Sequence, residues 1–437
     1  MQALEARDYF TDYDVLKDPY AFFEALRAHG PVYRQPETGI VFVTGFDESL
    51  EVLKNTEDFS SANCVQGSGA PLPFEPQGAD ISEQIEENRS KFLGSHLIVT
   101  YDGRPHSFSR ALLGRLFTPS RLKANAEYIS DLSAELVSAA VARGGCELIN
   151  DISVPFVTLV IADLLGVPAD DRQHFMTTLA ASAPPGALDG SNQHRTPLDF
   201  MQSYFRGYVA DRRKNPRDDV ITELATATFP DGSTPEAEEI VSLATFLFGA
   251  GQDTSAKLLS NTVKQLVEQP ELQARVRADP TLIPALLEEM LRIEGSTKAT
   301  FRFAKRDTQI GDVKVPVGTR IMVALAAGNR DPRRWDDPHA VILDRPRIKE
   351  HIGFGRGAHV CVGAPLARAE LRILLEHLLK ATADIDLLED VHGPRGARRL
   401  DYEPSFIIRG LENLHLVLKP AADFAPADRP ATVVGAA

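Results

Sequence analysis

Apolar residues recur at helical spacing along most of the chain, whereas strand-like stretches are short and lie near its two ends. The helices that this pattern predicts cover 19–27, 46–54, much of 105–269 and 284–292, and the strands cover 32–33, 41–43, 319–325 and 407–408. Between 60 and 102 the chain is rich in Gly, Pro, Asn and Ser, and such a long irregular stretch is usually functional or disordered. The pattern favours a mainly α protein with small β-sheets.

The segment 239–267 is apolar nearly all round, as a helix through the core should be. Gly249 and Gly251 each cost about 1 kcal/mol relative to alanine in a helix, and the close approach of a flat ligand would offset that cost. Thr254 follows Ala250 by four residues, so its hydroxyl can bond the Ala250 carbonyl and open a groove for water or dioxygen. The alternative is a helix kink without chemistry.

Cys361 lies in a run that contains Gly353, Gly355 and Gly357 and leads into an apolar helix near Pro365. Glycine allows positive φ and close approach of the backbone to a bulky group. A thiol just before a helix N-terminus faces free N–H groups and the positive end of the dipole, which should lower its pKa. A thiolate there would be a ligand for a soft metal centre such as haem iron; the alternative is a buried cysteine that acts as a small hydrophobe.

The run Phe354-Gly355-Arg-Gly-Ala-His359-Val-Cys361-Val-Gly363 resembles, position by position, the haem-binding loop of the cytochrome P-450 superfamily. The resemblance implies the P-450 fold, a mainly α helical prism that encloses haem b, with Cys361 as the axial thiolate ligand of the iron. It further implies that Phe354 packs beside the sulfur, that Gly355 and Gly363 border the cofactor, and that His359 reaches a haem propionate.

A second run, Ala250-Gly251-Gln-Asp253-Thr254, resembles the oxygen-activation motif of the same superfamily. The resemblance implies that Ala250 and Gly251 border the haem and that Thr254 and Asp253 are catalytic. Thr254 would assist oxygen activation, and Asp253 would relay protons from solvent as a general acid.

Two haem propionates in a pocket of low dielectric constant require cationic or hydrogen-bonding partners. His106 and Arg110, four residues apart, and the later Arg302 resemble the residues that fill this role in the superfamily. Taken singly, each would be assigned to the surface. Their assignment as propionate ligands depends on the order and spacing of the three residues together.

Glu289 and Arg292 share one face of a predicted helix and resemble the structural Glu-x-x-Arg pair of the superfamily, whose later partner aligns with Arg345. An exposed pair of this kind contributes only about 0–1 kcal/mol. If the pair is buried, removing one partner should cost roughly 3–5 kcal/mol.

No linker, repeat or shift of composition divides the 437 residues, so we expect one haem domain over 1–420 and a loose tail over 421–437. The net charge of -14 argues against nucleic acid as a partner. Cys64, Cys146 and Cys361 show no paired spacing, which argues against a disulfide framework or a zinc site and favours a reducing cytoplasm. Without a signal peptide or a bilayer-spanning run, we expect a soluble cytoplasmic monomer.

By resemblance, the chain is a monooxygenase that inserts one oxygen atom from O2 into a small hydrophobic substrate. The expected pocket wall comprises the loop 60–95, the region 180–204, and Phe246, Ala250, Thr297, Lys298, Thr300, Phe406 and Ile407. Lys298 would either bind a substrate carboxylate or turn its long side chain away.

No dinucleotide-binding fingerprint remains in the chain, so electrons should come from a separate ferredoxin and ferredoxin reductase. A basic cluster near the cysteine, formed by Arg345, Arg347, Lys349 and Arg356, would dock an acidic ferredoxin; the alternative is a solvated loop. Two other functions remain open. One is a peroxide-dependent peroxygenase, although such relatives typically lose the acid and threonine kept here, and the other is a non-catalytic haem sensor or binding protein.

Overall fold

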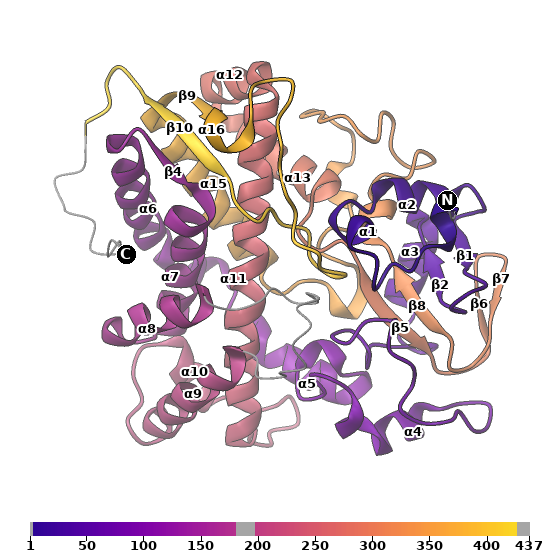
Figure 1. Ribbon diagram of the computed structural model, residues 1–437. Helices are drawn as coiled ribbons and strands as arrows, with labels where there is room; N and C mark the ends of the chain where they lie inside the picture. The colour runs from indigo at the N-terminus through magenta and orange to yellow at the C-terminus, as the bar shows by residue number, and fades with distance from the viewer. Residues whose placement is uncertain (1–2, 181–196, 426–437) are drawn as a thin grey trace.

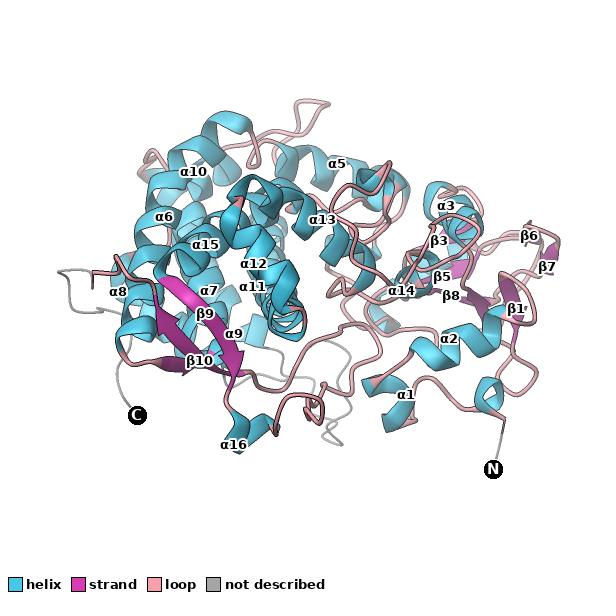
Figure 2. Cartoon of the chain, turned by 90° about the horizontal axis from the view of Figure 1, so that it is seen from above, coloured by secondary structure: helices cyan, strands magenta, loops and turns pink. Residues whose placement is uncertain are grey.

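A long central helix separates two parts of the molecule in the computed structural model, which describes residues 3–180 and 197–425. On one side lies a body of packed helices, and on the other lie the N-terminal helices with the largest sheet (Figures 1 and 2). None of the described helices combines the length and the apolar character that a bilayer span requires.

The α-helices are α1 Tyr13–Lys17, α2 Tyr20–Arg27, α3 Phe46–Lys54, α4 Ser82–Glu87, α5 Gly103–Gly114, α6 Pro119–Ala142, α7 Val154–Leu165, α8 Ala169–Ala180, α9 Pro197–Lys214, α10 Val220–Ala225, α11 Ala237–Glu268, α12 Pro270–Ala278, α13 Ile283–Ile293, α14 Leu325–Gly328, α15 Ala364–Ala381 and α16 Glu389–His392. The strands are β1 Val32–Arg34, β2 Val41–Val43, β3 Phe59–Ser60, β4 Gly145–Glu147, β5 Thr300–Ala304, β6 Thr308–Ile310, β7 Val313–Val315, β8 Arg320–Val323, β9 Thr382–Leu387 and β10 His415–Pro420. The mainly α architecture expected from the sequence is confirmed.

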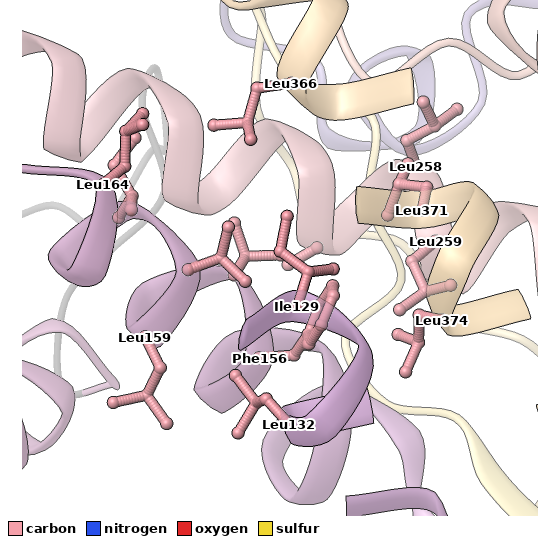
Figure 3. Packing of buried hydrophobic residues seen from close by; sticks show 14 of the residues in the cluster. Ile129, Leu132, Phe156, Leu159, Leu164, Leu258, Leu259, Leu366, Leu371 and Leu374 are labelled. Carbon is pink, nitrogen blue, oxygen red and sulfur yellow. The ribbon is translucent and has the colours of Figure 1, made fainter. Parts of the chain in front are cut away.

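The largest apolar core lies where α6, α7, α11 and α15 meet. Ile129 of α6, Phe156 of α7, Leu259 of α11 and Leu374 of α15 point toward one another there (Figure 3). All four side chains are essentially inaccessible to solvent, so their burial is a major source of folding free energy. The helix predicted over 239–267 is α11, and this core fixes its position.

The strands form a five-stranded sheet in the order β1-β2-β8-β5-β3, a three-stranded sheet β4-β10-β9 and a hairpin β6-β7. The strand predicted at 319–325 is β8, which pairs with β5 through Arg302 opposite Ile321. Residues 407–408 do not form a strand as predicted, although Ile408 makes an isolated antiparallel bridge with Thr297. The Ser405 hydroxyl accepts hydrogen bonds from the N–H groups of Ile407 and Ile408, at 3.2 and 3.0 Å, which turns the chain instead of extending it.

The stretch 60–102 is more ordered than its composition suggested. It contains α4, and its Asp80 forms an isolated bridge and an ion pair with Arg306, at 2.8 Å. The N–H of Ile81 donates to the carbonyl of Lys305 at 2.8 Å. These contacts hold the segment against the end of β5.

The expected Glu289–Arg292–Arg345 cluster is present and buried. Arg292 Nε lies 2.5 Å from Glu289 Oε2, and Arg345 Nε lies 2.7 Å from Glu289 Oε1. The two guanidinium groups also donate to the carbonyls of Asn329, Pro338, Ala340, Asp336 and Asp337. The carboxylate therefore holds two cations, and these cations bind the loop that leads to the cysteine segment.

The neighbouring residue, Glu288, makes a second connection that the sequence did not indicate. Its carboxylate lies 3.1 Å from His351 Nε2 and 2.5 Å from Arg368 Nε of α15. Burial alone would raise the pKa of Glu288, but hydrogen bonds from His351 and Arg368 lower it to about 2. Helix α13 is thereby tied to both ends of the cysteine loop.

Glu289→Gln should lower the free energy of unfolding by about 3–5 kcal/mol, because it leaves two buried guanidinium groups without their counter-charge. Glu238→Gln is the matched control: it breaks an exposed pair with Arg206, at 2.7 Å, and should cost less than about 1 kcal/mol. Urea unfolding followed by circular dichroism measures both. Equal losses in the two variants would contradict the structural role of Glu289.

Candidate functional site

The cysteine loop presents one thiol at the start of α15. Cys361 is exposed, and its N–H donates to the carbonyl of Phe354 at 2.9 Å. The N–H groups of Gly363 and Ala364 act on the sulfur as hydrogen-bond donors. The loop thus holds the sulfur in place through the backbone and leaves one side of it open.

The loop requires glycine at three positions, either for a positive φ or for lack of space. Gly355 and Gly357 have φ of 70° and 74°, and a Cβ on Gly357 would lie 2.4 Å from the carbonyl oxygen of Leu53. Gly353 does not have the positive φ expected from the sequence. It is required for space, because its Cβ would lie 2.4 Å from the Leu291 oxygen of α13.

The expected lowering of the Cys361 pKa is wrong for the polypeptide alone. Although one side of Cys361 is accessible, desolvation of its sulfur by the surrounding protein raises the pKa of this thiol and outweighs the opposing effects of the Gly363 and Ala364 N–H groups and of Arg110. A helix N-terminus is therefore not sufficient to make a thiolate here. A bound metal ion would do so, because a coordinating thiol is deprotonated outright.

The four basic residues selected from the sequence converge beside the thiol. The rings of His106 and His359 lie 4.0 Å apart, and Arg110 and Arg302 are close enough to act electrostatically on both. Burial, followed by the charge of Arg302, lowers the pKa of His359 to about 2. Ser61, which the sequence did not single out, lies with its Oγ 3.1 Å from His359 Nε2.

No acidic side chain among the described residues neutralises this cluster by direct contact. The guanidinium group of Arg110 makes no hydrogen bond to any described residue, and that of Arg302 donates only to Thr300 and to the carbonyl of Phe301. Asp102, whose charge acts on His106, accepts hydrogen bonds from the Ser60 hydroxyl and from the N–H of Ser61 instead. A ligand with two carboxylates would satisfy the cluster, so its donor set fits the propionates of haem.

One face of α11 is accessible, although the helix is otherwise mostly buried. Ala250 is exposed, and Phe246 and Thr254, one turn before and one turn after it, are half-buried. As expected, Thr254 Oγ1 donates to the Ala250 carbonyl, at 2.8 Å. A Cβ at Gly251 would lie 3.2 Å from Ile161 Cδ1 of α7, so helix packing also favours a small residue at this position.

Asp253 contacts a neighbouring residue that its motif in the sequence did not indicate. Its Oδ1 accepts a hydrogen bond from Lys257 Nζ, one turn along α11, at 2.5 Å. The motif spacing gave no sign of this partner, because the i, i+4 pair is also typical of exposed helix faces.

The expected pocket residues divide into two groups. Thr297 and Ile407 are half-buried, and Phe406 packs its ring against Phe301 with the centroids 5.8 Å apart. Lys298 does not face a pocket: its buried amino group donates to the Leu16 carbonyl at 2.5 Å. Of the expected wall at 180–204, residues 181–196 lie outside the described part of the chain.

Helix α15 carries a buried carboxyl group that the sequence did not indicate. Glu370 is 2% exposed, and its Oε2 has no hydrogen-bond partner among the described residues. Burial raises the pKa of Glu370 to about 8, against the smaller effect of the Ser255 hydroxyl on α11. Ser255 follows Thr254 directly, so a protonated carboxyl adjoins the oxygen-activation segment.

Comparison with known proteins assigns the family. The family model Cytochrome P450 matches residues 188–381. The cytochrome P450 monooxygenase PikC of Streptomyces venezuelae is 31% identical over 407 residues, which cover 92% of this chain and 91% of PikC. The substrate-free structure of the Mycobacterium marinum cytochrome P450 CYP150A6 is 45% identical, with a TM-score of 0.89 over 96% of this chain and 100% of that one.

The chain therefore belongs to the cytochrome P450 family, as the motifs indicated. Its fold is the P450 fold, its activity is that of a monooxygenase, and its cofactor is haem b with a cysteine thiolate as axial ligand. The basic cluster, the accessible face of α11 and the open thiol fit that cofactor.

Glu370→Gln should weaken the dependence of stability on pH. Because the pKa of Glu370 is about 8 in the fold and about 4.3 in an unfolded chain, the folded state holds this proton more tightly. The stabilisation is complete below about pH 4 and is lost as the pH rises toward 8, by at most about 1.4 kcal/mol per pH unit. Glutamine cannot ionise, so the variant should lack this loss.

Thermal unfolding of the protein between about pH 5 and pH 8 measures the effect. Glu376→Gln is the control on the same helix, since Glu376 forms a surface pair with Arg372 at 2.6 Å. A profile of Glu370→Gln that runs parallel to that of the unmodified protein would contradict the assignment.

Proposed function

We propose that this P450 inserts one oxygen atom from O2 into a small hydrophobic substrate, with Cys361 as the axial ligand of the haem iron. The observation that carries the proposal is the open thiol at the start of α15, beside a basic cluster that lacks an acidic partner among the described residues. Haem, when bound, supplies the activation of dioxygen and the transfer of one of its oxygen atoms.

The residues of the chain hold the cofactor from two directions in this proposal. His106, Arg110, Arg302 and His359 bind the propionates, which are the counter-charge that the cluster otherwise lacks. The backbone of Phe354, Gly355 and Gly363 shapes the loop around the sulfur, and Ala250 and Gly251 belong to the turn of α11 that borders the haem.

Thr254 and Asp253 serve oxygen activation in the proposal. The Thr254 hydroxyl donates to the Ala250 carbonyl, so its oxygen lone pairs are free to accept a hydrogen bond from a group on the accessible face of α11. Asp253 moves protons from solvent toward Thr254 as a general acid. The presence of both side chains favours an O2-dependent reaction over a peroxide-dependent one.

The substrate is apolar and of modest size in this proposal. Phe246 and Ala250 offer it an apolar face of α11, and Thr297, Phe406 and Ile407 line the opposite wall. Lys298 is not part of the pocket, so no carboxylate is required of the substrate.

Titration with terpenoids, steroids, fatty acids and aromatic acids tests whether the substrate is apolar. Binding is followed by the low-spin to high-spin shift of the haem. A shift with charged, hydrophilic ligands alone would contradict an apolar substrate.

Cys361→Ala should abolish the red-shifted Soret band of the reduced carbon monoxide complex, because alanine has no ligand atom. Cys64→Ala is the matched control. Its half-buried thiol lies 3.5 Å from Thr300 Oγ1 and is given no role in haem binding, so the band should persist. An unchanged band in Cys361→Ala would refute the ligand assignment.

Electrons come from a separate ferredoxin in this proposal, which docks on basic residues that precede the cysteine loop. The docking face contains Arg347 and Lys349, which are exposed and have no ionic partner among the described residues. Glu350, between them and the cysteine, already pairs with Arg334. Arg345, expected in the same cluster, is instead buried on Glu289 and does not belong to the surface.

Lys349→Glu should raise the KM for an acidic ferredoxin roughly tenfold at low salt, because it reverses a charge that steers the encounter. The difference from the unmodified protein should shrink as salt is added. Lys314→Glu, at the exposed position of β7 and outside the cysteine loop, makes the same change of net charge and should leave the KM nearly unaltered. Equal effects in both variants would contradict a local docking face.

A further inference from the structure

Two adjacent aromatic residues near the N-terminus contact a residue of the proposed substrate pocket that lies far along the chain. The Tyr9 hydroxyl donates to the Phe406 carbonyl at 3.0 Å, and the ring of Phe10 packs against the ring of Phe406 with the centroids 5.6 Å apart. The C-terminal stretch that carries Phe406 therefore meets the N-terminal part of the chain (Figure 1). One contact holds the backbone of Phe406, and the other holds its side chain.

A local turn places both aromatic side chains on the inner side of the N-terminal segment. The N–H of Phe10 donates to Asp8 Oδ1 at 2.9 Å, and the Thr11 hydroxyl donates to Asp8 Oδ2 at 2.9 Å. An aspartate that bonds the backbone two residues later is typical of such a turn. Tyr9 is inaccessible to solvent and Phe10 is 7% exposed, so two large rings at consecutive positions both point inward.

Three aromatic rings surround the contact with Phe406. The rings of Phe10, Phe301 and Phe406 lie in mutual contact, with centroid separations of 5.6 to 5.8 Å. Tilted and edge-on pairs at these distances attract one another beyond the effect of burial. Phe301 is inaccessible on β5 and Phe10 is nearly so, whereas Phe406 is half-buried. Phe406 is therefore the ring of the three that can touch a ligand.

Two glycines of the 60–95 loop show how closely these rings are packed. A Cβ at Gly67 would lie 2.7 Å from Phe406 Cε2, and a Cβ at Gly69 would lie 2.9 Å from Phe10 Cγ. The Phe406 ring is thus confined between the backbone of the loop, Phe10 and Phe301. Its position depends on each of these neighbours, because the packing leaves little room for adjustment.

The N-terminal segment is also attached to the other stretch of the proposed pocket wall. The side chain of Lys298 donates to the carbonyl of Leu16, and the N–H of Lys298 donates to the Ile407 carbonyl at 2.9 Å. Lys298 follows the wall residue Thr297 directly. The segment 9–16 therefore supports both stretches of the wall from the side away from the substrate.

We propose that Tyr9 and Phe10 are positioning residues that set the size of the substrate, and that they act through Phe406. Tyr9 fixes the backbone of Phe406, and Phe10 limits how far the ring can retreat when a substrate presses on it. The inference rests on the proposed function, in which Phe406 lines the pocket. It assigns a role in substrate selection to a segment that does not itself line the pocket.

A purely structural role for the two residues would predict a different result. Tyr9 and Phe10 would then only stabilise the core of the N-terminal helices, and their loss would lower stability without changing which ligands bind. Residues that position Phe406 should instead change the preference between ligands of different size. Such a preference is a ratio of affinities, and a general loss of stability does not alter it.

The test measures the binding of 1-alkylimidazoles, with chains from methyl to decyl, to the haem-loaded protein. The imidazole group ligates the iron in every member of the series, so the differences in Kd report on the alkyl chain. Phe10→Ala should leave the Kd of 1-methylimidazole unchanged and move the tightest binding to longer chains. The gain should be roughly fourfold for each methylene group that the enlarged pocket takes in.

Tyr9→Phe should weaken the dependence of Kd on chain length, because it removes the anchor of the Phe406 backbone and keeps the ring at position 9. Phe406→Ala is the reference, and it should move the tightest binding at least as far as Phe10→Ala does. A change in Phe10→Ala without one in Tyr9→Phe would overturn the role of Tyr9.

Two control variants remove equivalent groups elsewhere. Tyr20→Phe removes a hydroxyl that donates to the Ile293 carbonyl at 3.1 Å, and Phe46→Ala removes a buried ring that packs against Trp335 with the centroids 5.7 Å apart. Both should lower the temperature of thermal unfolding and keep the dependence of Kd on chain length. Changes in that dependence equal to those of Tyr9→Phe and Phe10→Ala would overturn a specific action through Phe406.

The outcomes separate this inference from the proposed function. If Phe406→Ala alters the dependence on chain length but Tyr9→Phe and Phe10→Ala do not, the positioning role is overturned and the pocket assignment of Phe406 stands. If Phe406→Ala does not alter it either, Phe406 lies outside the pocket and the inference falls. If affinity does not rise with chain length in the unmodified protein, the apolar pocket of the proposed function is contradicted, and the inference falls with it.

A failure of Phe10→Ala to fold would still leave a decisive variant. Tyr9→Phe keeps every apolar atom of the side chain, so the packing of the rings is preserved. An unchanged dependence of Kd on chain length in Tyr9→Phe would then overturn the proposal.

Discussion

Two adjacent buried carboxylates on α13 hold the segment on which the haem site depends. Glu289 binds Arg292 and Arg345, and through them the backbone that precedes the cysteine loop. Glu288 binds His351 at the start of that loop and Arg368 on the helix that follows it. The thiol lies between these anchors, on a chain whose glycines give it little internal rigidity. Its position is therefore imposed from α13, and the loop alone would not maintain it.

The electrostatics of the site differ on the two sides of the cofactor. Beside the thiol, basic side chains gather without an acid, which favours an anionic ligand and burial of its carboxylates. On α11 the arrangement is the reverse, with two carboxyl groups around the single ammonium of Lys257. The first arrangement suits permanent binding of charge. The second leaves one ammonium to compensate two carboxyl groups.

Much of this organisation could be predicted from short motifs, since each motif describes local geometry. The Thr254 hydroxyl reaches Ala250 because residues four apart on a helix are neighbours, and the pairing of Glu289 with Arg292 follows from a spacing of three. Local rules failed where burial decided the outcome. The N–H groups at the helix N-terminus lower the pKa of Cys361 by less than desolvation raises it, and Lys298 turned away from the pocket to the carbonyl of Leu16.

By itself, the sequence determined the family, the mainly helical architecture, the thiol and the residues that gather around the cofactor, because these depend on periodicity and on motifs a few residues long. Only the tertiary structure decided which charges meet across long distances in the chain. Glu288 meets Arg368, Glu403 meets Lys257, and the carboxyl group of Glu370 is buried near Ser255, and the spacing of the sequence indicates none of these contacts. The physical reason is that desolvation and long-range pairing are properties of the packed chain, and they are set by how α11, α13, α15 and the C-terminal segment come together.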